Sequence, residues 1–196
     1  GVRRGRGHVG ESPAQDFAGS ARVQYKGVPG LRIGSSAFLG RTGQGTAGIG
    51  DALLTMVEGD AKYSLEGIDL EGTVAYTGLS DSASINNRLA AQTPAVTDLV
   101  GNRMLGWYLE GAYHIFHHLW PETRKDLVLF SRYESFDTQH RMPTGFAANP
   151  ANERQTITSG ISDLPIPQVA LKADYMINKN QAKTGVDQFN LGVGFY

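Results

Sequence analysis

Hydrophobic residues recur at every second position in many segments of this chain, and the last nine residues show the pattern most clearly. In Gln188–Tyr196, the large apolar residues Phe189, Leu191, Val193 and Phe195 alternate with small or polar ones. A period of two is typical of a β-strand that has one apolar face and one polar face. The end of the chain is therefore predicted to be a strand.

Eight earlier segments repeat this alternation, which makes nine predicted strands. The earlier strands are expected at Phe17–Tyr25, Leu31–Leu39, Leu53–Tyr63, Ile68–Tyr76, Leu105–Ile115, Asp126–Asp137, Gln155–Asp163 and Val169–Ile177. Gln155–Asp163 has the weakest pattern, since only two of its residues are clearly apolar. Residues 1–14 are rich in Gly, Arg and Pro and are predicted to form a loop.

The predicted connections alternate between short and long. Short turns are expected at Gly27–Gly30, Leu65–Gly67, Pro121–Arg124 and Pro165–Pro167, and long loops at about 41–51, 79–103, 138–153 and 178–187. Within the second long loop, Leu89–Ala91 is expected to make one helical turn. Regular alternation of this kind is typical of outer-membrane β-barrels, which have short periplasmic turns and longer external loops.

The predicted fold is therefore all-β: a single domain over residues 1–196 that forms an antiparallel, up-and-down transmembrane β-barrel. Single-chain bacterial barrels have even numbers of strands, so nine strands indicate the C-terminal portion of a larger barrel. Tyr196 falls on the polar parity of the last strand, and we expect one more aromatic residue after it. No run of 18 apolar residues occurs, so no transmembrane helix is predicted.

Four segments resemble outer-membrane porins of the phosphate-selective porin O and P type. They are Pro29–Ser35 (PGLRIGS), Leu129–Asp137 (LFSRYESFD), Pro167–Tyr175 (PQVALKADY) and Phe189–Tyr196 (FNLGVGFY), and they spread over most of the chain. The resemblance implies a barrel of roughly 16 strands, a homotrimer, and passage of small solutes by diffusion. It does not carry phosphate selectivity to this chain, because no matching constriction motif can be placed.

The polar parity of the predicted strands collects charged residues, which on the barrel interpretation line a water-filled pore. The predicted lining residues are Arg22, Arg32, Glu58, Asp60, Lys62, Asp69, Glu71, Glu110, Arg132, Glu134, Lys172 and Asp174. The alternative for any one of them is a solvated ion pair without a role in selectivity. Aromatic residues near strand ends are predicted to lie at the membrane interface: Tyr25, Tyr63, Tyr76, Trp107, Tyr133, Tyr175 and Phe195.

Three histidines, His114, His117 and His118, lie together beside Trp120. Histidine is a common metal ligand, but a strand places His114 and His118 on one parity and His117 on the other. Packing at the membrane interface is the favoured interpretation, and no metal or other cofactor is predicted.

Other function classes find little support in the composition. The formal net charge is −1 and there is no basic stripe with interleaved aromatics, which argues against nucleic-acid binding. The chain has no cysteine. Ser131, Asp137 and His140 are close in sequence, but no nucleophile-elbow motif exists, so no enzyme is predicted. A literal G-x-G-x-x-G at Gly5–Gly10 lacks the flanking strand and helix of a nucleotide site.

The function expected from the sequence is that of a porin in the outer membrane of a Gram-negative-type bacterium. Its partners would be membrane lipid and small hydrophilic solutes or ions. The alternatives are a barrel without transport activity, serving as an adhesin or scaffold, and a secreted β-sandwich that binds a ligand.

Overall fold

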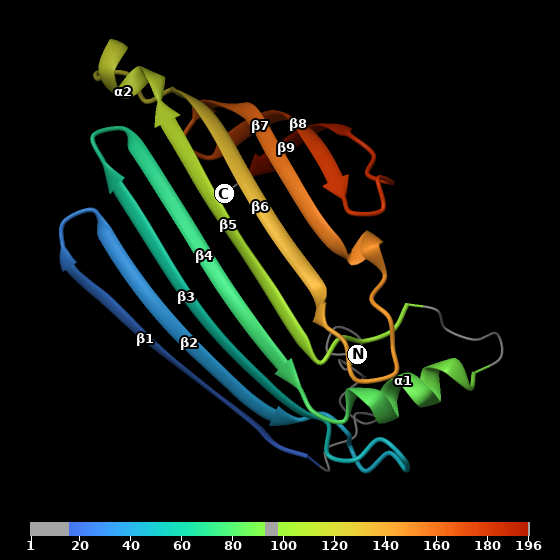
Figure 1. Cartoon of the computed structure of the whole chain (residues 1–196). Coiled ribbons are helices and arrows are strands. Elements are labelled where there is room, and N and C mark those ends of the chain that lie inside the picture. The colour runs from blue at the N-terminus through green and yellow to red at the C-terminus, as the bar shows by residue number, and fades with distance from the viewer. Residues whose placement is uncertain (1–15, 93–97, 196) are drawn as a thin grey trace.

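The computed structural model describes residues 16–92 and 98–195, and its nine strands form one antiparallel sheet. Each strand pairs with its neighbours in chain order (Figure 1). The strands are β1 (Ala18–Val28), β2 (Leu31–Arg41), β3 (Leu53–Leu65), β4 (Ile68–Leu79), β5 (Arg103–His114), β6 (Asp126–Arg141), β7 (Glu153–Ile166), β8 (Val169–Asn180) and β9 (Gln188–Phe195). The predicted all-β antiparallel architecture and its nine strands are confirmed.

Two of the tight turns follow directly from their residues. Pro29 fixes its own φ, and Gly30 takes a positive φ of 76°, the combination that a type II turn requires. At the β3–β4 turn, Glu66 and Gly67 both have positive φ, which matches the twist of a two-residue hairpin. A side chain at position 30 would come 2.5 Å from the Ser64 carbonyl oxygen, so a glycine is needed there.

The connections fall into two sets at opposite ends of the sheet. At the turn end lie residues 29–30, 66–67, 115–125 and 167–168; at the loop end lie 42–52, 80–92 with 98–102, 142–152 and 181–187. The loop end also carries α1 (Ser82–Ala90) and the short 3-10 helix η1 (Pro150–Asn152). Among the described residues, no helix is long and apolar enough to cross a membrane.

The β5–β6 connection differs from the sequence prediction. Residues 115–125 were expected to continue β5 through Ile115 and then turn at Pro121–Arg124, but Ile115 begins α2 (Ile115–Leu119). The regular alternation of short and long joins is therefore broken here. The predicted helical turn at Leu89–Ala91 is likewise the end of a longer helix, α1.

The register assigns every strand residue to one of two faces, which we call the polar face and the apolar face. Along one row of paired residues, Arg32, Lys62, Glu71, Glu110 and Arg132 are neighbours on β2 to β6. The next row belongs to the opposite face and runs Tyr25, Ile33, Ala61, Gly72, Leu109, Tyr133, Ile157 and Ile177. The alternation seen in the sequence is thus kept in register across the whole sheet.

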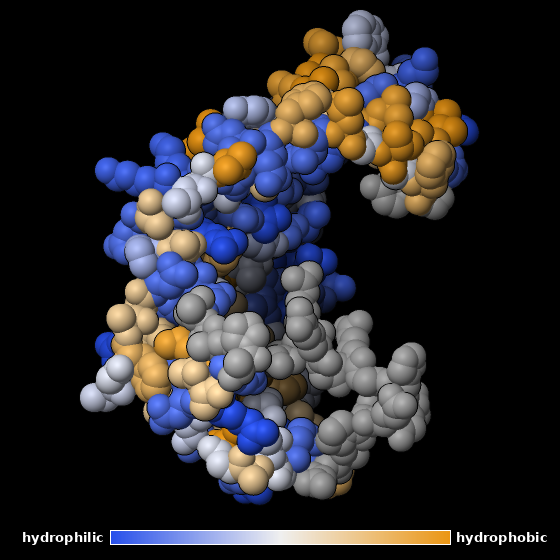
Figure 2. Space-filling view, turned by 90° about the vertical axis from the view of Figure 1, so that its right-hand side faces the viewer, coloured by the Kyte–Doolittle hydropathy of each residue, from blue (hydrophilic) through white to orange (hydrophobic). Residues whose placement is uncertain are grey.

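In a water-soluble sheet the apolar face is buried and the polar face is exposed. Here the apolar face is the more exposed one. On the apolar face, Val57 is 49% exposed and Leu109 is 59% exposed, whereas Asp174 on the polar face is only 9% exposed. The molecule is C-shaped, with hydrophilic residues around its hollow and hydrophobic residues gathered on the upper arm (Figure 2). Only Ala52, Leu54, Leu79 and Val128 are buried hydrophobic residues in the described part of the chain.

Within residues 16–92 and 98–195 the sheet does not close. β1 pairs with β2 and β9 pairs with β8, and no pairing joins β1 to β9. Both outer strands therefore present one unpaired edge. The predicted loop 1–14 and the terminal Tyr196 lie outside the described residues.

A small core at the loop end fixes the α1 segment to the polar face of the sheet. Ala52, Leu54 and Leu79 form its centre, and Phe38, Ile49, Ile85 and Val100 pack against them. Asn86 is fully buried and exchanges two hydrogen bonds with Val100: its Nδ2 donates to the Val100 carbonyl at 2.9 Å, and its Oδ1 accepts from the Val100 amide at 2.7 Å. One side chain thus links α1 to the segment just before β5.

Replacing Asn86 with Ala is expected to loosen this connection without unfolding the sheet. The change leaves the half-buried amide and carbonyl of Val100 without their Asn86 partner, which costs about 1–3 kcal/mol. Hydrogen exchange of residues 82–92 and 98–100 should become faster by the corresponding factor, while exchange in β6 and β7 stays unchanged. Asn87→Ala, at the exposed neighbouring position, is the control. Equal protection in the two variants would contradict this role of Asn86.

Candidate pore wall

All the charged residues predicted to line a pore lie on the polar face. The register pairs Arg22 with Ser36 and Ser36 with Glu58, and it places the other predicted positions on the same side through equivalent pairs. The structure therefore brings together on one curved wall residues that are more than 150 positions apart in sequence, from Arg22 to Asp174.

The first cluster on this wall surrounds Arg22. Its guanidinium lies 3.1 Å from Glu58 Oε2 and 2.7 Å from Asp60 Oδ2, and Ser36 Oγ donates a further hydrogen bond to Glu58. The two carboxylates come from alternate positions of β3, so they point the same way and can share one cation. Arg22 is thereby fixed across β2.

The central row separates charges by sign. Arg32 and Lys62 are direct register partners, and so are Glu71 and Glu110, the next residues along the row. Lys62 Nζ is 3.6 Å from Glu71 Oε2. The other carboxylate oxygen of Glu71, Oε1, accepts a 2.6 Å hydrogen bond from the Tyr108 hydroxyl. The buried Nε of Arg32 has no hydrogen-bond partner among the described residues. The row therefore has a positive part over β2–β3 and a negative part over β4–β5.

Two cations on β6 and β8 lie over aromatic rings of the polar face. The Arg132 guanidinium carbon is 3.9 Å from the centroid of Tyr108, and an Nη of Arg132 is 3.0 Å from Glu134. Lys172 Nζ lies 4.3 Å above the ring of Phe130 and 3.8 Å from Asp174. Contacts of a cation with a ring face hold long side chains in place, so these charges are positioned and not merely solvated.

Two charged groups of the polar face were missed in the sequence. Arg154 lies over the ring of Phe136, 5.9 Å from its centroid, and Asp126 contacts His114. Both have the parity of the predicted lining residues. Arg154 was missed because β7 begins two residues before the predicted strand and had the weakest pattern. Parity alone, applied beyond the predicted strand ends, would have found it.

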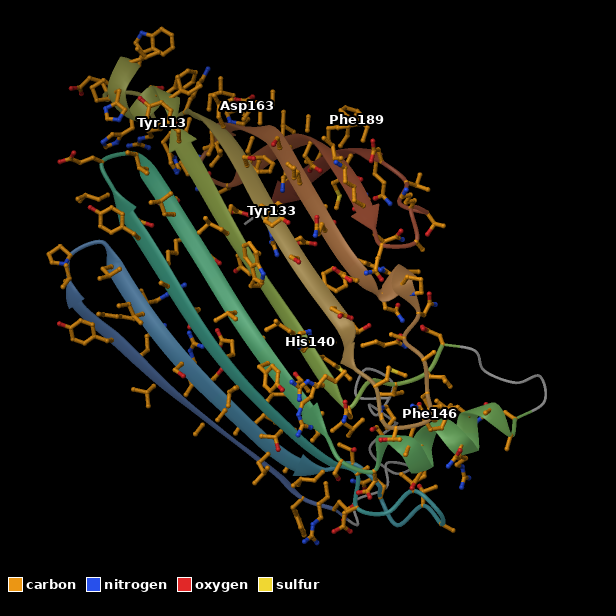
Figure 3. The ribbon with its side chains drawn as sticks, viewed as in Figure 1. Tyr113, Tyr133, His140, Phe146, Asp163 and Phe189 are labelled. Carbon is orange, nitrogen blue, oxygen red and sulfur yellow. The ribbon has the colours of Figure 1, made fainter. Side chains whose placement is uncertain are left out.

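The predicted interface aromatics all lie on the apolar face. Tyr25, Tyr63 and Phe195 are near the turn end, Tyr76 is near the loop end, and Trp107 pairs with Val74 in the middle of β4. Tyr133 and Tyr175 are in the middle of their strands, and Figure 3 shows Tyr133 midway along β6. Both strands extend several residues beyond their predicted ends, which moves these two positions away from the strand ends. The Tyr133 ring packs 5.3 Å from Trp107, centroid to centroid.

His114 is held between two carboxylates, Asp69 and Asp126. Its Nδ1 contacts Asp126, and its Nε2 lies 3.3 Å from Asp69 Oδ2, so a hydrogen bond on each side requires a doubly protonated ring. His118 stacks on Tyr113 at 5.4 Å, with His117 beside it at 5.0 Å. Across 16–92 and 98–195, no three potential ligand side chains come together as a metal site. The three histidines join α2 to the sheet.

The residues considered for a nucleophilic triad do not converge. Ser131 Oγ shares a 2.8 Å hydrogen bond with Ser159 Oγ. Asp137 Oδ2 is 4.0 Å from His140 Nδ1, near the loop end of β6 (Figure 3). Six residues of extended strand separate Ser131 from Asp137, a distance of about 20 Å. At that distance neither Asp137 nor His140 can act as a base for Ser131.

No protein-family model matches the chain, but comparison with known proteins shows a relative. The chain is 29% identical over 195 residues to an uncharacterised protein of Aquifex aeolicus (strain VF5), and the match covers 98% of this chain. The chain spans 44% of the length of that relative. More than half of the relative thus lies outside the matched region.

Proposed function

We propose that this chain forms part of a transmembrane β-barrel in the outer membrane of a Gram-negative-type bacterium, and that small hydrophilic solutes or ions diffuse through the barrel. The observation that carries the proposal is the distribution of polarity over one curved sheet. The apolar face is uncovered, while the enclosed polar face holds ordered ion pairs.

Physical chemistry favours lipid as the environment of the apolar face. Proteins in water rarely expose contiguous apolar patches beyond a few hundred Å². Here exposed apolar side chains occur on every strand from β1 to β9. A lysine or arginine near the middle of that face would cost about 2–4 kcal/mol in lipid. All the predicted lining residues are on the other face, where water can solvate them.

The open edges support a barrel larger than nine strands. In lipid, the unpaired amide and carbonyl groups of β1 and β9 would each cost several kcal/mol. β1 and β9 run in the same direction, so an all-antiparallel closure needs an odd number of further strands between them. The length of the Aquifex relative leaves room for such strands. The resemblance to phosphate-selective porins O and P suggests roughly 16 in total, assembled as a homotrimer.

The alternatives differ in what they require of the sheet. A β-sandwich needs a second sheet packed on the apolar face. The described residues provide one sheet only, and the apolar face is exposed. An adhesin or scaffold barrel would keep the same outer face but would need no open path along the polar face. Conductance therefore separates it from a porin.

The full-length protein, reconstituted in a planar lipid bilayer, is expected to produce discrete current steps. The steps should grow with salt concentration, because ions would pass through a water-filled path. Migration on a detergent gel should also change on heating, since a barrel stays folded in cold detergent. Folded, heat-modifiable protein that gives no steps would refute the porin and favour the scaffold. Protein that stays monodisperse in buffer without detergent would refute the membrane barrel itself.

A further inference from the structure

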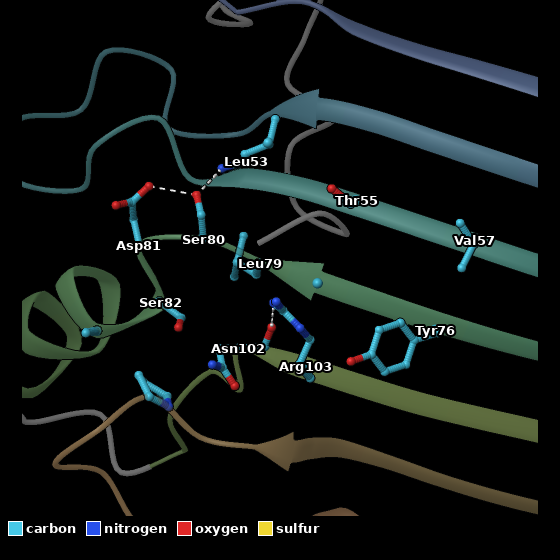
Figure 4. A pocket seen from close by; sticks show the side chains of 13 residues that line it. Leu53, Thr55, Val57, Tyr76, Leu79, Ser80, Asp81, Ser82, Asn102 and Arg103 are labelled. Carbon is cyan, nitrogen blue, oxygen red and sulfur yellow. Dashed lines mark hydrogen bonds between the residues drawn. The ribbon is translucent and has the colours of Figure 1, made fainter.

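The apolar face carries a groove at the loop end, formed by β3, β4 and the start of β5 (Figure 4). The groove encloses about 600 Å³. Leu53, Val57 and Tyr76 provide an apolar wall, and Ser80 and Arg103 provide polar groups nearer the loops. An elongated apolar molecule with a polar end would match this order of surfaces.

Arg103 is the unexplained group in the groove. Its Nη1 donates a 2.9 Å hydrogen bond to the Asn102 carbonyl, and it lies over Gly78, where an added Cβ would come within 3.0 Å of the same atom. No carboxylate lies within ion-pair distance of it among the described residues. Most of its donors are therefore free to bind a ligand.

The register partner of Arg103 increases the positive charge. Arg141 lies directly opposite across β5–β6, and its guanidinium has no ion pair or hydrogen bond in the described part of the chain. Like charges directly opposite each other destabilise a sheet. By contrast Arg41, at the loop end of β2, lies 3.5 Å from Asp51. The Arg103–Arg141 pair thus lacks the counter-charge that comparable positions have.

One acidic residue lines the groove, but it is already bonded. Asp81 Oδ2 accepts hydrogen bonds from Ser80 Oγ at 2.7 Å and from the Ala52 amide at 3.2 Å. Its carboxylate is therefore fixed by the β3 and β4 ends and is more than 4 Å from Arg103. The groove keeps an unneutralised cation at its polar end.

We propose that this groove binds one anionic, phosphate-bearing lipid, with the phosphate on Arg103 and an acyl chain along Val57 and Tyr76. This inference rests on the proposed function, because it requires the apolar face to lie in a membrane. A guanidinium matches phosphate oxygens with two parallel hydrogen bonds. Basic side chains at a membrane surface attract anionic lipids. The groove is also continuous with the apolar face, so a lipid can enter sideways.

Native mass spectrometry of the detergent-solubilised protein tests this site with phosphatidylglycerol and phosphatidylcholine as probes. The wild-type protein should retain one phosphatidylglycerol in preference to phosphatidylcholine. Arg103→Gln should lower that retention about fivefold, and Arg141→Gln should lower it in the same direction. Arg41→Gln is the matched control, at the same end of the sheet but already paired, and should bind as the wild type does.

Several outcomes would overturn the site. They are equal retention of the two lipids by the wild-type protein, unchanged retention in Arg103→Gln, and displacement of the lipid by an equal concentration of inorganic phosphate, which would indicate a free-anion site. If Arg103→Gln fails to fold, the lipid preference of the wild type and the Arg141→Gln result decide. Channels in Arg103→Gln should match the wild type, so loss of lipid selectivity with intact channels leaves the porin proposal standing.

Discussion

Replacing Val74 with arginine should destabilise the folded protein in lipid vesicles by about 2–4 kcal/mol, the cost of a cation on the lipid face near the bilayer centre. Val74 lies in the middle of β4, between Gly59 and Trp107, and is 50% exposed on the apolar face. At an exposed position in water, such a change is usually within about 0.5 kcal/mol. Urea unfolding in vesicles measures the difference.

The adjacent residue provides a control at the same depth. Ala75 faces the other way and pairs with Glu58, so Ala75→Arg places its charge on the polar face beside a carboxylate. This variant should retain nearly the stability of the wild type. A similar loss in both variants would mean that the two faces share one environment. If Val74→Arg leaves the free energy of unfolding unchanged, the apolar face does not contact lipid.

The fold could be predicted from the sequence wherever alternation was strict. A one-residue slip would move every apolar side chain to the polar face, so the pattern fixes the face of each residue as well as the strand. In β9 this is sufficient, since Phe189, Leu191 and Val193 leave only one arrangement. Strand ends were less predictable: β6 continues from Asp137 to Arg141, because polar residues at the loop end obey no apolar period.

The β5–β6 connection shows what periodicity cannot predict. Tyr113 and Ile115 keep the apolar parity of β5, so alternation extends the strand by one residue too many. Its end is set instead by tertiary contacts: His114 is tied to Asp69 and Asp126, and the ring of His118 stacks on Tyr113. The two partners of His114, Asp69 and Asp126, come from β4 and β6. No local signal in the sequence contains them.

The candidate pore wall was predictable as a face but not as a set of contacts. Parity placed Arg132 and Glu134 together, yet it could not indicate that Arg132 lies over Tyr108 or that Tyr108 donates to Glu71. Those contacts depend on register between β4, β5 and β6, which turn lengths and bulges determine. Arg103 was not predicted for the same reason: its isolation follows from the register that places it against Gly78 and Arg141.

Reversing the positive part of the central row should give the proposed pore a clear preference for cations. Arg32 and Lys62 are register partners. Arg32 has no carboxylate partner among the described residues, and Lys62 Nζ lies 3.6 Å from Glu71 Oε2. Arg32→Glu with Lys62→Glu removes two positive charges and adds two negative ones. A unit charge at 4 Å changes an ion's energy by about 1 kcal/mol even in water, equivalent to roughly fivefold in occupancy. The cation-to-anion permeability ratio, obtained from reversal potentials in a salt gradient, should rise by at least that factor.

The salt dependence of the permeability ratio shows whether the selectivity change comes from charges on the polar face or from a general change in the protein. The Debye length falls from about 10 Å at 0.1 M salt to about 3 Å at 1 M, so the selectivity gained should be strong at 0.1 M and weak at 1 M. Lys125→Glu with Lys183→Glu makes the same change in net charge, but these residues lie in connections at opposite ends of the sheet. This control should shift the ratio much less. An equal shift would show that net charge alone governs passage, and an unchanged ratio in the Arg32 and Lys62 variant would show that ions do not travel along the polar face. The central row separates positive from negative charge along the sheet, so charge reversal there should change ion selectivity more than charge reversal in the connections.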